Sequence, residues 1–222
     1  MDILWLGHSS FYLRGKSAKM VMDPYDSQLV GLKYSKVEAD IVTVSHNHSD
    51  HNAVTNVVGV DGNTPFLIQG PGEYEVQGVS IFGVAAFHDE EKGNQRGKNT
   101  IFVVDFEGVK FCHLGDLGHR LEDKQLTEIG NVDVLLLPVG GFFTIDAKAA
   151  TEVVAQLEPK IVIPMHYLVE GMNKDNFSQL TPVEPFLSQI GASSVTPLPK
   201  LIITKEKLPD TLQIILLERK TG

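Results

Sequence analysis

Four side chains of types that commonly bind metal ions lie within six consecutive residues of this sequence. Residues 46–51 read HNHSDH, so the four are His46, His48, Asp50 and His51. Imidazole and carboxylate groups suit zinc, and they also suit manganese or iron. His46 and His48 project the same way on an extended segment, because side chains there alternate with a period of two. We therefore expect these two histidines to bind one ion, and Asp50 and His51 to reach a second ion where the chain turns.

Three further residues of the same chemical types lie far from this cluster in the sequence. His88, Asp116 and His166 each come at or just after the end of an apolar, strand-like run. Each alone would more often be structural, but together with the cluster they supply what two ions need. The expected ligand groups are His46, His48 and His88 for the first ion, Asp50, His51 and His166 for the second, and Asp116 as the bridge.

Two bound divalent ions favour hydrolysis. They would lower the pKa of a shared water to about 7, which provides a nucleophile at neutral pH, and they would polarise the attacked oxygen. Asp50 could accept a proton while it remains a ligand. His119 lies three residues beyond Asp116, and its imidazole could donate a proton to a leaving group without binding metal. A surface histidine at the start of a helix is the alternative for His119.

Strands must position these residues, because most of them follow apolar runs that glycine, proline or polar residues interrupt. The expected strands cover residues 3–6, 11–13, 20–22, 41–45, 66–69, 79–87, 100–106, 109–114, 134–138, 161–165 and 214–217. The expected helices cover residues 123–129, 147–157 and 185–190, and Asp146 can cap the second of them. Many strands early in the chain, with helices interleaved later, indicate two packed sheets with helices outside.

Several connecting segments could border the site. Residues 89–98 and 168–181 each follow a candidate histidine and look irregular, so each could be a substrate lid or an ordinary solvated loop. Residues 70–74 (GPGEY) read as a turn. Phe142 and Phe143 could line a pocket, although core packing is the more common fate of phenylalanine.

The composition is that of a globular protein, with 42% hydrophobic residues, 21% charged residues and a net charge of -9. This acidic balance disfavours a large non-specific nucleic-acid surface, because it repels phosphate backbones. The single cysteine, Cys112, cannot form an internal disulfide, and the sequence shows no signal peptide and no apolar run long enough to span a membrane. We therefore expect one cytoplasmic hydrolase domain over residues 1–222.

The motifs of this chain resemble those of the metallo-β-lactamase superfamily, and the resemblance covers nearly the whole chain. In the family's order they are LGHSS at 6–10, MDP at 22–24, the cluster at 46–51, FHD at 87–89, HLGD at 113–116 and PMHY at 164–167. The nearest branch is similar to L-ascorbate-6-phosphate lactonase and to the phospholipase D that cleaves N-acylphosphatidylethanolamine. The resemblance implies an α/β fold, an αββα sandwich of two mixed sheets, with the site at one edge and the two-ion ligand set given above.

Three residues around the expected ligands have weaker assignments. Asp23 matches the family's early aspartate, which supports the cluster loop, since metal-bound imidazoles commonly donate their other N–H to such groups. His8 matches a histidine that is frequent in this branch. The roles of His8 and His113 stay open.

The favoured function is a hydrolase that cleaves a lactone or phosphoester of a small anionic substrate with two divalent ions, zinc first and manganese or iron as alternatives. A locally positive metal site on an acidic protein suits an anionic substrate. The alternatives are a phosphodiesterase that acts on nucleic acid or lipid and a non-enzymatic binding protein on the same scaffold. The fold alone separates none of them, and the sequence also allows a homo-oligomer.

Overall fold

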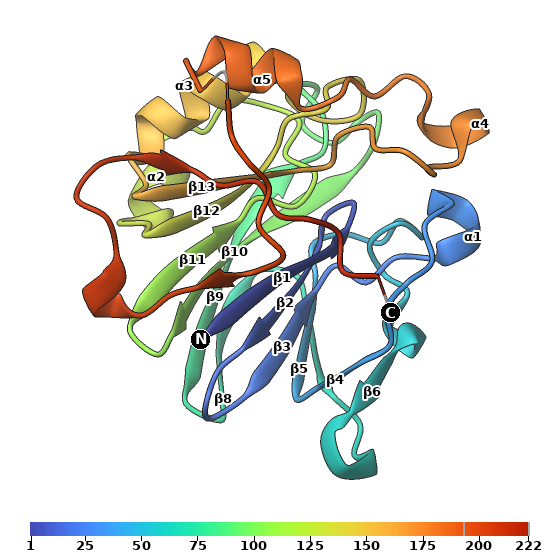
Figure 1. The fold of residues 1–222 in the computed structure, drawn as a ribbon, viewed down its shortest axis with the longest axis vertical. Coiled ribbons are helices and arrows are strands. Elements are labelled where there is room, and N and C mark those ends of the chain that lie inside the picture. The colour runs from blue at the N-terminus through green and yellow to red at the C-terminus, as the bar shows by residue number, and fades with distance from the viewer. Residues whose placement is uncertain (193, 222) are drawn as a thin grey trace.

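Two β-sheets pack against each other in the computed structural model, which describes residues 1–192 and 194–221 (Figure 1). One has the order β14-β1-β2-β3-β5-β7 and the other has the order β15-β13-β12-β11-β10-β9-β8. The strands of the first sheet are β1 (Asp2–Gly7), β2 (Ser10–Arg14), β3 (Lys19–Met22), β5 (Ile41–Val44), β7 (Phe66–Gln69) and β14 (Leu201–Ile202). Those of the second are β8 (Gly72–Val76), β9 (Val79–Phe87), β10 (Lys98–Phe106), β11 (Val109–His113), β12 (Val134–Pro138), β13 (Ile161–Met165) and β15 (Gln213–Ile214).

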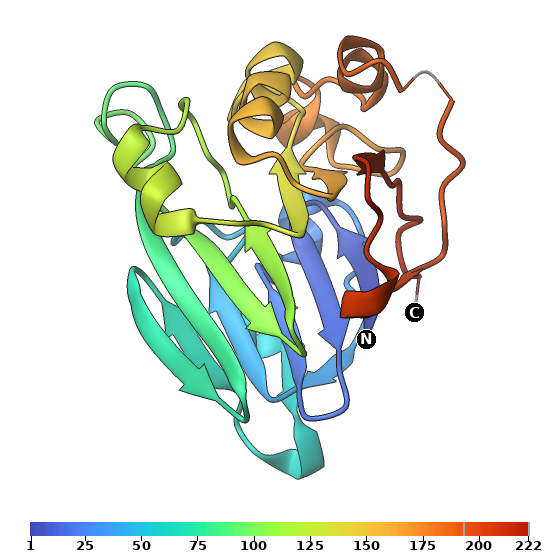
Figure 2. The same cartoon turned by 90° about the vertical axis from the view of Figure 1, so that its left-hand side faces the viewer.

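Helices and a small third sheet cover the outer faces. The helices are α1 (Ser27–Val30), α2 (Asp123–Ile129), α3 (Ala147–Leu157), α4 (Lys174–Phe177) and α5 (Glu184–Gln189), and the small sheet pairs β4 (Val37–Ala39) with β6 (Val57–Gly59). Short 3-10 helices cover Val54–Asn56, Val60–Gly62 and Lys205–Lys207. Figures 1 and 2 show α2, α3 and α5 together at the upper end of the molecule, whereas α1 and α4 lie on the side of β1 to β5. The expected αββα sandwich is confirmed.

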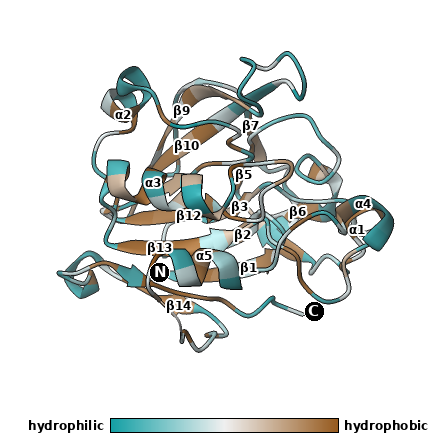
Figure 3. Cartoon of the chain, turned by 90° about the horizontal axis from the view of Figure 1, so that it is seen from above, coloured by the Kyte–Doolittle hydropathy of each residue, from teal (hydrophilic) through white to brown (hydrophobic). Residues whose placement is uncertain are grey.

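Two apolar cores account for these layers. The larger core joins side chains of both sheets, such as Phe11 and Phe102, to the buried faces of α3 and α5. The smaller core lies on the other side of the first sheet, where Val21 and Val42 pack with Phe177 of α4. The strands β10, β12 and β13 are accordingly coloured largely brown in Figure 3.

The helix α3 shows why the sequence pattern worked. Its buried side chains, from Ala150 to Leu157, form the single apolar face expected of a helix that packs on a sheet. The side chain of Asp146 accepts a hydrogen bond from the N–H of Ala149 at 2.8 Å, as expected for the N-cap. The helix ends at Glu158, which adopts a left-handed φ of 45°.

The strand directions bring all candidate site residues to one edge. In the first sheet β1, β3 and β5 run the same way, because β2 is antiparallel to both β1 and β3, and β3 is parallel to β5. In the second sheet β9, β11 and β13 also share one direction. The residues that follow these six strands are His8, Asp23, His46, His88, Asp116 and His166, so the topology gathers them at the strands' C-terminal ends.

Three sequence-based predictions were wrong in detail. Residues 70–74 do not form only a turn, because β8 starts at Gly72 and pairs with β9. The segment 168–181 is not wholly irregular, since Asn173 caps the four-residue helix α4. The last strand stops at Ile214 and does not continue to residue 217. No helix in the described part of the chain is long and apolar enough to cross a membrane.

Candidate metal centre

Four histidines converge on one carboxylate oxygen at this edge. The Nε2 atoms of His51, His88 and His166 each lie 3.2 Å from Asp116 Oδ2, and His46 Nε2 lies 3.8 Å from it. All five side chains are buried. They come from four separate loops that follow β5, β9, β11 and β13, so only the folded chain assembles them.

Two groups of possible ligand atoms with no residue in common surround this point, and a third, of Asp23, His46 and His51, overlaps both. The first consists of His46, His48 and His88, and the second of His8, Asp50, His51 and His166; within each group the ligand atoms lie within 4.8 Å of one another. All seven residues that the sequence predicts as ligands therefore lie together. The sequence did not place His8 among them. The assignment of these residues to ions remains a prediction.

The nitrogen and oxygen atoms of this site are suited to bind cations, because several of them have no hydrogen-bond partner in the described chain. His46 Nε2, His51 Nε2, Asp116 Oδ1 and both ring nitrogens of His166 are buried and have no hydrogen-bond partner among the described residues. A buried polar atom without a partner costs about 1–3 kcal/mol. A divalent ion bound by nitrogen and carboxylate oxygen would satisfy such atoms.

Neighbouring residues fix the orientation of two of these rings. His51 Nδ1 donates a hydrogen bond to Asp23 Oδ2 at 2.8 Å, which turns His51 Nε2 toward Asp116. The same aspartate accepts the Ser45 N–H at 2.8 Å, and the Ser45 hydroxyl lies 2.9 Å from His46 Nδ1. These hydrogen bonds confirm the supporting role expected for Asp23, and they add Ser45, which the sequence analysis missed.

The loop that carries Asp116 is also built for close approach. The side-chain oxygen of Asn99 accepts the Asp116 N–H at 3.0 Å, and its amide nitrogen donates to the Leu114 carbonyl at 2.8 Å. Gly115 adopts a φ of 55°, and an added Cβ there would collide with Asn99 and with Ser45. No local motif marks Asn99, since its partners lie 15 and 17 residues away.

The protonation states suit this arrangement. Burial opposes ionisation of Asp116, but His166 and His51 hold the pKa of its carboxyl well below the ordinary value. Burial lowers the pKa of His46 to about 3, so that ring is neutral, as metal binding requires. His51 differs: burial lowers its pKa, but Asp116 and Asp50 raise it well above the ordinary value. Without an ion, a proton on His51 balances carboxylates that an ion would otherwise neutralise.

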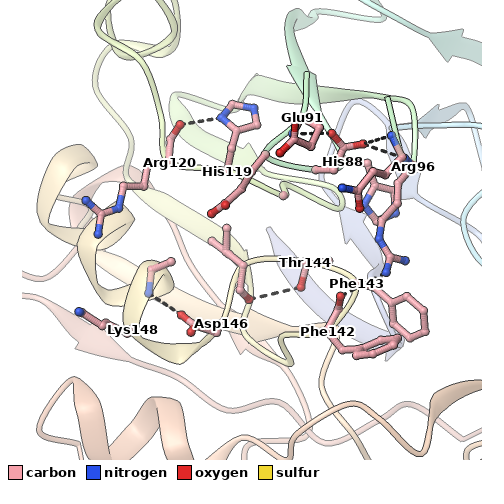
Figure 4. A pocket seen from close by; sticks show the side chains of 16 residues that line it. His88, Glu91, Arg96, His119, Arg120, Phe142, Phe143, Thr144, Asp146 and Lys148 are labelled. Carbon is pink, nitrogen blue, oxygen red and sulfur yellow. Dashed lines mark hydrogen bonds between the residues drawn. The ribbon is translucent and has the colours of Figure 1, made fainter. Parts of the chain in front are cut away.

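A cavity of about 480 Å³ opens beside His88 (Figure 4). Arg96 reaches across it, with its guanidinium carbon 4.9 Å from the centre of the Phe143 ring and 5.6 Å from that of Phe142. Arg96 also lines a second cavity of about 620 Å³ next to His46. Phe142 and Phe143 thus lie at the pocket, and 54% of Phe142 is exposed.

The loop that carries Arg96 is held by a single carboxylate. Asp89 accepts hydrogen bonds from the backbone N–H groups of four residues of the loop, at 2.7 to 3.1 Å; they are Glu91, Gly93, Gln95 and Arg96. The segment 89–98 is therefore an ordered loop at the border of the pocket.

His119 and His113 lie near the centre but outside both ligand groups. His119 lines the same cavity, and its Nδ1 donates to the Arg120 carbonyl at 2.6 Å while its Nε2 accepts the Phe87 N–H at 3.1 Å. Both nitrogens of His119 are thus engaged by the backbone, which favours the structural alternative over proton transfer. His113 Nε2 donates to the Ser9 carbonyl at 2.8 Å and joins the two sheets.

Comparison with known proteins agrees with the fold. The profile of the Beta-lactamase superfamily domain matches residues 2–166. The chain belongs to the metallo-beta-lactamase superfamily. This superfamily member is 31% identical over 193 residues to a UPF0173 metal-dependent hydrolase of Archaeoglobus fulgidus, an alignment that covers 75% of this chain and 83% of that protein. It is 32% identical over 192 residues to one from Pyrococcus abyssi, with 75% and 84% covered.

Solved structures are similar to this chain over nearly its whole length. A crystal structure from Thermotoga maritima, classed with Zn-dependent hydrolases of the metallo-beta-lactamase superfamily, is 39% identical, with 97% of both chains covered and a TM-score of 0.78. A metallo hydrolase of Ignicoccus hospitalis is 19% identical, with 97% and 94% covered and a TM-score of 0.66, and shows the fold alone. The expected superfamily is confirmed, while the finer resemblance to L-ascorbate-6-phosphate lactonase stays a prediction.

Proposed function

We propose that this chain is a hydrolase that uses two divalent ions to cleave a lactone or phosphoester of a small anionic substrate. The observation that carries the proposal is the convergence of four imidazole nitrogens on Asp116 Oδ2, in a site where several donor atoms lack other partners. The proposed ligands are His46, His48 and His88 for one ion, Asp50, His51 and His166 for the other, and Asp116 between them. Zinc is the first choice, because imidazole-rich sites suit it.

The ions would supply a water that is nucleophilic near neutral pH and a positive field for the attacked oxygen. The chain's own residues would do the rest. Asp50 keeps 16% of its side chain exposed and can exchange a proton with solvent or substrate. His51 and the His8 hydrogen bond outweigh burial and hold the pKa of Asp50 well below its ordinary value, so its carboxylate is ionised, as binding a cation requires. Residues 1–222 would form one such hydrolase domain, working in the cytoplasm.

The anionic character of the substrate is supported by Arg96. Arg96 makes no ion pair with any described residue, and its guanidinium lies in the lining of both cavities beside the metal centre. Of the four acidic residues that line the first cavity, Asp89 and Asp146 already accept backbone N–H groups, while Glu90 and Glu91 are the other two. A guanidinium pairs well with carboxylate or phosphate. The exposed Phe142 ring offers a flat apolar surface next to it.

The proposal is tested by metal analysis and hydrolysis together. Protein purified without chelator should contain two divalent ions per chain by elemental analysis, because seven ligands exceed one tetrahedral site. The ion-loaded protein should hydrolyse bis(p-nitrophenyl) phosphate or a simple lactone, and a chelator should abolish the activity. One ion or none after zinc, manganese and iron have been offered would contradict the two-ion centre. Cleavage of single-stranded DNA but of neither small substrate would favour the nuclease alternative.

Arg96→Gln tests the substrate charge. We expect kcat/KM to fall about tenfold or more for anionic bis(p-nitrophenyl) phosphate, since a charge-assisted pair contributes about 1.5–3 kcal/mol. Hydrolysis of a neutral p-nitrophenyl ester should change far less. Lys148→Gln, at the far side of the same cavity, is the matched control for lost positive charge. An equal loss on both substrates in Arg96→Gln would assign Arg96 to the structure of the loop.

A further inference from the structure

His8 is a histidine in the second ligand group that the predicted ligand set leaves unused. It follows β1 directly, and none of its surface is exposed. Its backbone adopts a left-handed φ of 52°, a conformation that non-glycine residues seldom take without a reason. Its ring centre lies 4.1 Å from that of His166 and 5.2 Å from that of His51.

The backbone of His8 ties the first strand to the metal centre. Its carbonyl accepts the Trp5 indole N–H at 2.9 Å and the His166 backbone N–H at 3.2 Å. The ring of Phe177 lies 5.2 Å away on another side. These contacts fix where the His8 imidazole can point.

That imidazole points at one oxygen of Asp50. His8 Nε2 lies 3.1 Å from Asp50 Oδ2, and the carboxylate can only accept, so the imidazole N–H donates. The same Oδ2 lies 3.6 Å from His51 Nε2, which means that it faces the second ligand group. Asp50 is only half-buried, so it needs a partner to hold its orientation.

We propose that His8 is a positioning residue for the second ion: its Nε2–H holds Asp50 Oδ2 toward the group formed with His51 and His166. This inference rests on the proposed two-ion function. The proposed role concerns only the second ion, because His8 does not belong to the group of His46, His48 and His88 that would bind the first. Partners of metal ligands typically affect metal affinity by about 10- to 100-fold.

Competition titration of Zn²⁺ against a chelator of known affinity tests the role without any substrate. Wild type should bind two ions in two resolved steps. In His8→Ala the affinity of the second, weaker binding step should fall by about 10- to 100-fold, and the affinity of the first step should not change. His8→Gln should restore binding close to wild type, because a glutamine amide can donate from the position of Nε2. His119→Ala, a histidine beside the centre but outside both groups, is the control and should titrate like wild type.

Other results would overturn the inference in distinguishable ways. Equal loss in His8→Ala and His8→Gln would make His8 a direct ligand, and unchanged titration of both would give it no role. Weakening of both steps would mean a general structural effect. His8→Asn, whose amide is too short to reach Asp50, replaces His8→Ala if the alanine variant does not fold. Wild type that binds a single ion would overturn the two-ion function and this inference together, whereas two steps with wild-type affinities in every variant would overturn the inference alone.

Discussion

Two buried aspartates lie at opposite ends of the second sheet, and their surroundings differ. Asp133 precedes β12 and accepts the Lys110 N–H at 3.0 Å and the Lys205 ammonium at 2.8 Å, with the Lys160 ammonium at 3.6 Å. Asp116 follows β11 and is surrounded by imidazoles, and its Oδ1 has no hydrogen-bond partner in the described chain. Both side chains are nearly closed to solvent.

The difference separates stability from function. The carboxylate of Asp133 accepts hydrogen bonds from groups of the folded chain, so it stabilises the fold. The carboxylate of Asp116 and the rings around it keep unused ligand atoms, which costs free energy unless something binds there. A buried polar cluster that the fold leaves unsatisfied therefore marks a functional site, and one that the fold satisfies marks a structural one.

The largest effect should come from Asp116→Ala. We expect it to lower kcat/KM by about 10³-fold or more, or about 4 kcal/mol of transition-state stabilisation, because the residue lies between the two proposed ions. The unfolding temperature of the metal-free variant should change little beside the loss of activity, since Asp116 Oδ1 has no hydrogen-bond partner in the part of the chain that the structure describes and only the Oδ2 contacts with the surrounding imidazoles are lost. Steady-state kinetics with thermal unfolding measure both. Activity near that of wild type would refute the bridging role, and a large loss of stability would refute the contrast with Asp133.

Asp133→Asn should show the opposite pattern. We expect unchanged kcat/KM and a free energy of unfolding about 1–2 kcal/mol lower at pH 7, because charge-assisted hydrogen bonds are lost while the half-exposed lysines remain screened by water. Denaturant unfolding measures the difference. A variant as stable as wild type would show that the lysines contribute nothing.

The difference in free energy of unfolding between wild type and Asp133→Asn should depend on pH. Burial opposes ionisation of Asp133, but Lys205 and the Lys110 N–H lower the pKa of its carboxyl in the folded protein. A lowered folded pKa stabilises the protein above the unfolded value of about 3.9 and loses that contribution as the pH falls through the folded value. The stability gap between wild type and Asp133→Asn should therefore be full at pH 7 and shrink below about pH 4. A gap that grows on acidification would contradict the sign.

The smallest effect should come from His119→Ala. The sequence hypothesis gives His119 a catalytic role, whereas its two backbone hydrogen bonds place it with the satisfied groups. We expect unchanged metal content and a small rate loss. A general acid contributes about 10²- to 10⁴-fold to the rate, and the loss should be smaller than that. A loss in that range at full metal occupancy would restore the catalytic role and would break the rule drawn from Asp116 and Asp133.

The sequence predicted the buried strands, and the structure brings the seven candidate ligands together, for physical reasons. The strands β12 and β13 are buried at every residue, so their apolar runs have no competing reading. The seven candidate ligands could be identified in the sequence because residues of metal-binding types follow such apolar runs closely. The edge strand β8 was missed because its residues are alternately half-buried and exposed, and its pairing with β9 comes from tertiary structure.

The surrounding shell was less visible because it depends on contacts between distant segments. Asp50 and His8 are 42 residues apart in the chain, and Asn99 and Asp116 are 17 residues apart. No spacing rule links such pairs before the strands are aligned. Asp23 was the exception, because a family motif marks it.

The four N–H groups gathered by Asp89 have a consequence for the speed of substrate capture. That carboxylate fixes the backbone of its loop while the protein folds, so the conformational entropy of ordering the loop is lost once, before any encounter. A loop that closed over each new substrate would lose that entropy at every binding event and would add an opening step to every turnover. We therefore expect Arg96 to be in its binding position before the substrate arrives. The rate of substrate binding should then be limited by diffusion into an open cleft.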